Sequence, residues 1–100
     1  MSNRAIEFII GDYGPAEHPK LTVEVFSAYI KPFYEALKKA LPYYCWHYEP
    51  DRQTWFILPA YTEQAAQVAL EHFSAVWIVQ GEKRTNFRTG EVIEQASLFG

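Results

Sequence analysis

Residues 43–58 read YYCWHYEPDRQTWFIL, in which two aromatic-rich runs flank a Pro-Asp-Arg segment at 50–52. Aromatic and β-branched residues are enriched in strands, whereas Pro and Asp are typical of turns. Two such runs joined by a short polar segment are typical of a β-hairpin. We therefore predict a hairpin with strands at 43–49 and 53–58 and a loop of about three or four residues.

The first strand of this hairpin carries aromatic side chains on both of its faces. Side chains alternate between the faces of a strand, which places Tyr44, Trp46 and Tyr48 together. The other face receives the rest of the run, namely Tyr43, Cys45, His47 and Glu49. We favour packing of one aromatic face against Trp55 and the helices. The alternative is a platform on which unpaired bases stack.

Outward from the hairpin, hydrophobic periodicity predicts three further strands and two helices. The strand segments are short runs that are continuously apolar or that alternate between apolar and polar residues. The helical segments instead repeat their apolar residues at spacings of three and four. The expected strands are 5–10, 21–26 and 76–79, and the expected helices are about 29–41 and about 62–73.

The first predicted helix has one apolar stripe and two defined ends. Its stripe repeats every four residues, at Tyr29, Phe33, Leu37 and Leu41. Pro32 is tolerated in a first turn, and Pro42 stops the helix. Lys38 and Lys39 lie in the last turn, where a positive charge is favourable at the negative end of the helix dipole.

These elements predict an α+β fold, with a small mixed or antiparallel sheet and two helices packed on one face, in the order ββαββαβ. Residues 1–80 are the single expected domain, and 81–100 are the expected C-terminal tail. Hydrophobic residues make up 49% of the chain, which excludes global disorder. A chain this short has modest stability, so homodimerisation would help it.

Composition also limits the partners and the compartment. The net charge is −3, which argues against tight DNA binding. The lone Cys45 cannot form an internal disulfide, and the first apolar run is too short for a signal peptide or a membrane span. We expect a cytoplasmic protein with no membrane partner.

A series of short motifs runs from residue 21 to residue 73. Its parts are a strand at 21–26, a helix ending in Leu37-Lys38-Lys39, the pair Tyr48-Glu49, and Trp55 seven residues after Tyr48. In this order the segment resembles a HARP domain, the small module of annealing helicases that remodel stalled replication forks. The resemblance implies a module that recognises DNA structure and a tryptophan that packs the hairpin onto the helices.

The hairpin departs from that family in its charge. Positions that are rich in Arg and Lys in the family are here occupied by Trp46, His47, Asp51, Gln53 and Thr54. Arg52 is the one positive residue of the turn. Phosphate affinity depends on neutralised charges and counterion release, so the resemblance implies only weak DNA binding.

A second group of basic residues follows the last predicted strand. Lys83, Arg84 and Arg88 lie close together in the sequence, with a glutamate on either side. The flanking acids favour a solvated loop. The alternative is a weak contact with forked or single-stranded DNA. The candidate nucleic-acid-binding residues are Arg52, Lys83, Arg84 and Arg88.

The last residues before a final glycine are Gln95, Ala96, Ser97, Leu98 and Phe99. They resemble the clamp-binding pentapeptide of bacterial replication and repair proteins, which has Gln, a small or apolar residue, Ser or Asp, Leu and Phe. The resemblance implies that Leu98 and Phe99 enter an apolar cleft, that Gln95 holds a polar subsite and that Ser97 is a minor contact. Ala96 stands where leucine is commonest, which implies weaker binding.

The pentapeptide also meets the physical requirements of a docking segment. Two adjacent large apolar side chains in a polar tail have no obvious partner in the rest of the chain. Burying each of them in a partner contributes about 1.5 to 3 kcal/mol before ordering costs. The alternative is that residues 92–99 form a last strand or short helix that buries Leu98 and Phe99 in their own domain.

Catalytic and metal chemistry is not expected. Cys45 and the scattered histidines His18, His47 and His72 lack the spacing of a structural zinc site. No orienting group or oxyanion loop accompanies Cys45, and the glycines of the first loop fit no nucleotide-binding motif. We expect no catalytic residue, no metal and no cofactor.

The leading hypothesis is a non-catalytic accessory of DNA replication or repair, tethered to the bacterial sliding clamp by its tail. One alternative is a small-molecule-binding or enzymatic α+β domain with a pocket between the helices and the aromatic hairpin, in which Tyr48, His47 and Cys45 face a ligand. Another alternative is a homo-oligomeric protein-interaction module.

Overall fold

The chain is built around one mixed β-sheet, seen in a computed structural model that describes residues 4–94. Seven strands form the sheet, and two α-helices and two short 3-10 turns connect them. The strands are β1 (Ala5–Ile10), β2 (Val23–Phe26), β3 (Trp46–Glu49), β4 (Thr54–Ile57), β5 (Ala75–Gln80), β6 (Lys83–Asn86) and β7 (Val92–Glu94). The helices are α1 (Lys31–Ala40) and α2 (Thr62–Ala69), and the 3-10 turns are Tyr43–Cys45 and Pro59–Tyr61.

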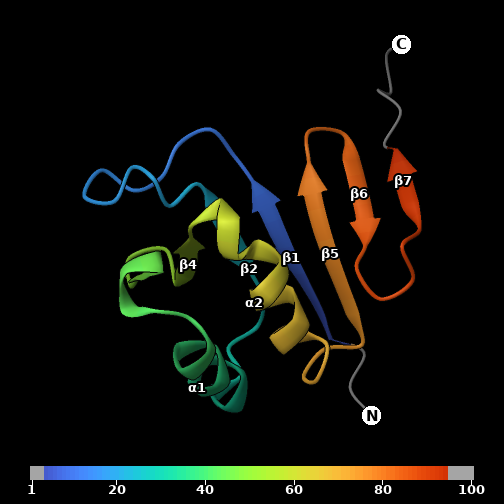
Figure 1. Cartoon of the computed structure of the whole chain (residues 1–100), viewed down its shortest axis with the longest axis horizontal. Helices are drawn as coiled ribbons and strands as arrows, with labels where there is room; N and C mark the ends of the chain where they lie inside the picture. Colours follow the sequence, from blue (N-terminus) through green and yellow to red (C-terminus); the bar gives the residue numbers. More distant parts are fainter. Residues whose placement is uncertain (1–3, 95–100) are drawn as a thin grey trace.

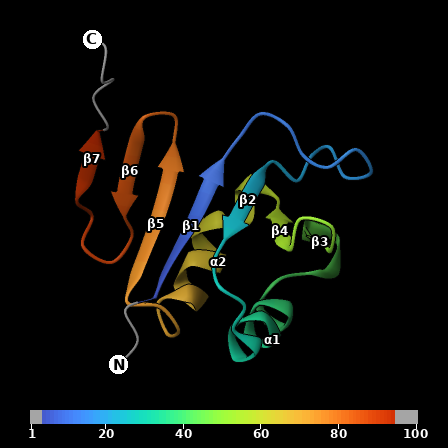
Figure 2. The same ribbon diagram turned by 180° about the vertical axis from the view of Figure 1, so that it is seen from behind.

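The strands lie in the order β3-β4-β2-β1-β5-β6-β7. β1 and β5 are parallel, and every other neighbouring pair is antiparallel. Both helices cover the same face of the sheet (Figure 1), and the opposite face is seen when the molecule is turned round (Figure 2). The α+β class is therefore confirmed, with a mixed sheet.

The sheet is larger than the sequence predicts. The elements up to residue 80 follow the expected order, but β6 and β7 then extend the sheet into the segment expected to be tail. Gln80 pairs with Lys83, so Gly81 and Glu82 form a two-residue hairpin turn. Gly81 has φ +61°, which suits the first position of such a turn. The prediction of tail from residue 81 was wrong for β6 and β7, because Lys83–Asn86 is polar throughout and Val92–Glu94 is too short to show a periodic pattern.

The hydrophobic core lies between the helices and the face of the sheet that they cover. Alternate residues of β1, β2 and β4 point into this layer, as the period of a strand requires. α1 contributes three buried side chains from one stripe. The largest fully buried side chains are those of Ile6, Phe8, Val23, Val25, Phe33, Leu37, Cys45, Ile57 and Val76.

The hairpin strands are shorter than predicted at their outer ends. Pro42 precedes a 3-10 turn at Tyr43–Cys45, so β3 begins only at Trp46. Residues 50–53 form the loop, and Glu49 pairs with Thr54 across it. Trp46 and Tyr48 lie on the helix side, while Cys45 is wholly buried among core residues. The predicted grouping of Cys45 with His47 on one strand face was therefore wrong.

A loop of residues 11–22 folds over one end of the open face. The amide of Gly11 donates to the carbonyl oxygen of Thr22 at 2.9 Å, which closes the loop at its base. A Cβ atom on Gly14 would lie 2.4 Å from the carbonyl oxygen of His18, so only glycine fits there. In the described part of the chain no helix has the length and hydrophobicity needed to cross a bilayer.

Candidate functional site

An aromatic cavity of about 250 Å³ lies between α1 and the β3–β4 hairpin. α1 places Tyr34 and Lys38 on one side, four residues apart and therefore on the same helix face. β3 contributes alternate residues that share its helix-facing side. The lining residues are Tyr29, Tyr34, Lys38, Trp46, Tyr48 and Trp55.

Trp55 is the central ring of this cavity. Tyr34 stacks on it, with ring centroids 5.0 Å apart and an interplanar angle of 14°. Trp46 and Tyr48 pack against it from β3, at centroid distances of 4.7 and 5.6 Å. The expected packing of the hairpin aromatics against Trp55 is present. Trp46 and Tyr48 nevertheless remain half-buried, so part of each ring is open to the cavity.

The cavity has one charged group. The Nζ atom of Lys38 lies 5.9 Å from the ring centroids of both Trp46 and Trp55. No carboxylate is among the lining residues. The indole Nε1 atoms of Trp46 and Trp55 are buried in the surrounding core and meet no acceptor in the described part of the chain. The electrostatics of the cavity therefore favour a guest with negative charge.

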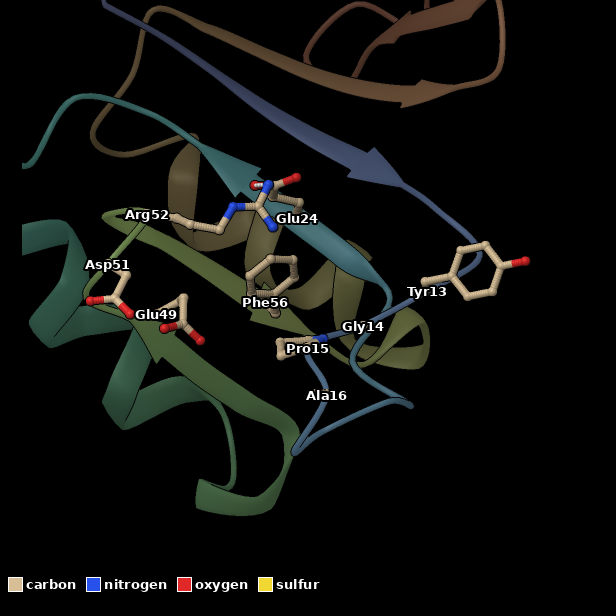
Figure 3. A pocket seen from close by; sticks show the side chains of 9 residues that line it. All are labelled: Tyr13, Gly14, Pro15, Ala16, Glu24, Glu49, Asp51, Arg52 and Phe56. Atoms are coloured by element: carbon tan, nitrogen blue, oxygen red, sulfur yellow. Dashed lines mark hydrogen bonds and ion pairs between the residues drawn. The ribbon is translucent and has the colours of Figure 1, made fainter.

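A second cavity of about 370 Å³ lies on the open face, beneath the 11–22 loop (Figure 3). Arg52 crosses it, donating from Nη2 to Oε2 of Glu24 at 3.1 Å and lying 5.5 Å from the Phe56 ring. Glu49 and Asp51 also line it, so its carboxylates outnumber its single guanidinium. Among residues 4–94, no group of three or more His, Cys, Asp or Glu side chains could hold a metal ion.

The histidine and cysteine of the hairpin lie on opposite sides of the sheet. His47 Nε2 is 3.4 Å from Oε2 of Glu49, and its ring packs on His18 at 4.4 Å. Cys45 is inside the core, where its Sγ donates to the carbonyl oxygen of Pro42 at 3.0 Å. Burial raises the pKa of the Cys45 thiol, which disfavours the nucleophilic thiolate. Of the three residues suggested to face one ligand, only Tyr48 lines the aromatic cavity.

The four candidate nucleic-acid-binding residues do not meet on one surface. Arg52 is paired with Glu24 at the hairpin turn, whereas the other three belong to β6 and the β6–β7 loop. Arg84 bonds Oε2 of Glu7 at 2.9 Å and lies 4.5 Å from the Trp77 ring.

Arg88 binds backbone carbonyl groups just after the end of α2. Its Nη2 atom donates to the backbone carbonyl oxygens of Leu70 and Phe73, both at 2.9 Å. These carbonyls follow α2, where a positive charge is favourable. Lys83 is exposed at the start of β6. Three of the four candidates thus have partners inside the domain, which reduces what they can offer to a phosphate.

The clamp-binding candidates Gln95, Ser97, Leu98 and Phe99 lie outside the described residues. Among the described residues, the last strand is β7, which runs to Glu94. Two apolar side chains of β7, Val92 and Ile93, are 50% and 42% exposed. The alternative that residues 92–99 form a last strand or short helix has a strand at Val92–Glu94, and its remaining residues lie outside the described part of the chain.

Sequence reasoning did not identify Tyr29, Tyr34 and Lys38 as neighbours of the hairpin aromatics. The signal was present in part, since Tyr34 and Lys38 are four residues apart on the helix that precedes the hairpin. Comparisons of the chain with protein-family models, curated proteins and solved structures gave no match. Its function must therefore be inferred from its residues and their geometry.

Proposed function

We propose that the protein is a non-catalytic accessory of DNA replication or repair, tethered to a bacterial sliding clamp through residues 95–99. The observation that carries the proposal is the segment Gln95-Ala96-Ser97-Leu98-Phe99, which has the residue types of a clamp-binding pentapeptide. It follows directly on β7, the edge strand of the sheet. A strand paired to the domain immediately before the peptide supports its use as a tether.

The expected affinity is that of a transient contact. Burying Leu98 and Phe99 contributes about 1.5 to 3 kcal/mol each, and hydrogen bonds from the peptide backbone and Gln95 add to this. The loss of freedom on ordering the peptide offsets part of the total. A dissociation constant on the order of micromolar follows, which corresponds to about −8 kcal/mol.

The domain itself is proposed to touch DNA only weakly. The net charge of −3 repels phosphates, and three of the four candidate basic residues are already paired. Tethering compensates for weak contacts by raising the local concentration of the domain at its site of action. This proposal places the protein in the cytoplasm with the replication machinery, and homodimerisation stays a prediction that sedimentation equilibrium can check.

Binding of the intact protein to purified bacterial sliding clamp tests the proposal. Replacing both Leu98 and Phe99 by alanine is expected to remove binding, because these side chains supply most of the buried apolar area. Tyr13→Ala is the matched control, since it removes an aromatic ring that is 87% exposed elsewhere on the surface. A double variant that binds as well as the parent protein would contradict the proposal.

Ala96→Leu gives a complementary gain-of-function test. Leucine is commonest at this position of the pentapeptide family, and its added side chain buries further apolar surface. Each buried methylene contributes about 0.8 kcal/mol, so several-fold tighter clamp binding is expected. Fluorescence anisotropy with labelled clamp can measure this change. Unchanged or weaker binding would argue against the family register assigned to residues 95–99.

A second candidate function is supported by the aromatic cavity. Its lining of aromatic rings with one ammonium group is typical of a binding site for a small organic ligand. Tyr48 lines it, as the small-molecule alternative expects, but His47 and Cys45 lie elsewhere. This candidate requires no catalytic residue and is compatible with a tethered accessory protein.

A further inference from the structure

The aromatic cavity offers ring faces rather than a closed hydrophobic hole. Tyr29 is 71% exposed at its mouth and packs against Tyr34 at a centroid distance of 5.1 Å. Trp46 and Tyr48 are half-buried on the opposite wall. Aromatic rings bind best to a flat partner that stacks on them. The geometry therefore selects a planar guest.

The charge of the cavity selects the electrostatic character of that guest. The Lys38 ammonium lies 5.9 Å from the centroids of Trp46 and Trp55, where a bound cation would otherwise be attracted to the rings. A quaternary or methylated ammonium is thus repelled by the protein's own lysine. An anionic group is attracted, and no lining carboxylate opposes it.

Size narrows the guest further. The cavity volume of about 250 Å³ is below the roughly 300 to 1,000 Å³ of sites for drug-sized ligands, which favours a single ring system.

We propose that this cavity binds one unpaired nucleobase of a single-stranded nucleic acid, with an adjacent phosphate on Lys38. A base inside a duplex keeps both faces stacked, so only an unpaired base can enter. Lys39 follows Lys38 at the end of α1, and both are exposed, so a strand that leaves the cavity can place a second phosphate there. A free nucleotide has no such second contact. The named lining residues all belong to 29–55, and the proposal does not depend on clamp binding.

Tryptophan fluorescence measures this binding in the full-length protein. Trp77 lies on the open side of the sheet beside Arg84, so Trp77→Phe leaves the emission of Trp46 and Trp55. A short oligothymidine is expected to quench that emission saturably at low salt. A duplex of the same length and a thymidine mononucleotide are the comparison ligands, and both are expected to bind at least about tenfold more weakly. Adding Leu98→Ala and Phe99→Ala to this background keeps the test independent of the clamp proposal.

Two substitutions and their controls examine the walls of the cavity. Tyr29→Ala is expected to weaken oligothymidine binding about fivefold or more, whereas Tyr43→Ala, which removes a ring that is 85% exposed outside the cavity, is expected to have no effect. Lys38→Gln is expected to weaken binding and to lower the slope of log affinity against log salt by about 0.7, the value for one phosphate of a single strand. Lys20→Gln, which removes a lysine of the 11–22 loop, is expected to leave the slope unchanged.

The outcomes separate the proposal from its rivals. Saturable quenching that needs about fivefold or more oligothymidine in the Tyr29 variant and is less salt-dependent in the Lys38 variant supports a base in the cavity. Absence of quenching by the single strand, or equal binding by both variants and the parent, overturns it. Equal affinity for the mononucleotide overturns the single-stranded source, and equal affinity for the duplex overturns the requirement for an unpaired base.

Discussion

At the residue scale, Trp55 links the fold to the candidate site. It is only 3% exposed, it contacts rings from α1 and β3, and it also forms the floor of the aromatic cavity. Tyr29 lies in the same cavity but is mostly exposed. Trp55 therefore has a structural role, whereas the ring of Tyr29 is available for binding. Measurements of the free energy of unfolding can distinguish these two roles.

Trp55→Ala is expected to lower the free energy of unfolding by about 3 to 5 kcal/mol, because it leaves a large cavity in the core. Tyr29→Ala is expected to change it by no more than about 0.5 kcal/mol, as is usual for exposed positions. Urea denaturation followed by circular dichroism measures both. Similar losses for the two variants would show that the Tyr29 ring is part of the core.

Cys45 is expected to be an unreactive, structural thiol. Burial raises the pKa of the thiol, so little thiolate is present near neutral pH and the sulfur is not accessible. Labelling by an aromatic disulfide reagent should be slow in the folded protein and should accelerate strongly in urea. Fast labelling of the folded state would contradict the buried position of this thiol.

The raised pKa of Cys45 also predicts a dependence of stability on pH. The thiol in the unfolded chain ionises at its ordinary pKa, whereas the folded protein retains the proton to higher pH. Its stabilising contribution is therefore full below the ordinary thiol pKa and declines as pH rises toward the raised value. Cys45→Ala should remove this part of the decline, which begins as the pH rises through the ordinary thiol pKa, as measured by urea denaturation.

At the scale of elements, the sequence predicts the parts that have strong periodicity. The alternating strands, the first helix and the aromatic hairpin all have local signals, and the structure contains each of them. Of the predicted helix stripe, Phe33 and Leu37 are buried in α1, whereas Tyr29 and Leu41 lie outside its bounds and Tyr29 is 71% exposed. β6 and β7 have no such signal, because Lys83–Asn86 is polar throughout and β7 has only three residues. The position of β6 depends on its pairing with β5, and the position of β7 depends on its pairing with β6. The Gly81-Glu82 turn was the one local indication of this pairing.

The residues of the candidate site were also only partly predictable from local sequence patterns. The aromatic residues of the hairpin were recognisable from sequence, but the lysine that gives their cavity a charge belongs to α1. The pairing of Arg52 with Glu24 and of Arg84 with Glu7 could not be foreseen either, because each partner lies on a strand distant in sequence. Tertiary structure, rather than local pattern, decides which basic side chains remain free.

The turn between β5 and β6 is the element whose loss is easiest to detect. Gly81 has φ +61° with no atom near its missing Cβ, so Gly81→Ala is costly through the backbone alone. We expect a loss of about 1 to 2 kcal/mol in the free energy of unfolding, compared with little change for Glu82→Ala. Thermal and urea unfolding measure both variants. Equal stability of the two would indicate a turn that does not need glycine at position 81.

At the scale of the whole molecule, the proposals describe a domain with two weak and separate contacts. The tail is proposed to bind the clamp, and the aromatic cavity is proposed to bind an unpaired base. Neither contact needs high affinity, because linked weak contacts reinforce one another through effective concentration. The net charge of −3 is consistent with a protein that does not bind duplex DNA broadly.

Calorimetric titration of purified bacterial sliding clamp with the intact protein, and with a chain that ends at Glu94, tests the central claim most directly. Ending the chain at Glu94 keeps every helix and strand found among residues 4–94 and removes the pentapeptide and the final glycine. We predict a dissociation constant on the order of micromolar for the intact protein and no detectable heat for the shortened one. Equal binding by both chains, or no binding by either, would contradict the account.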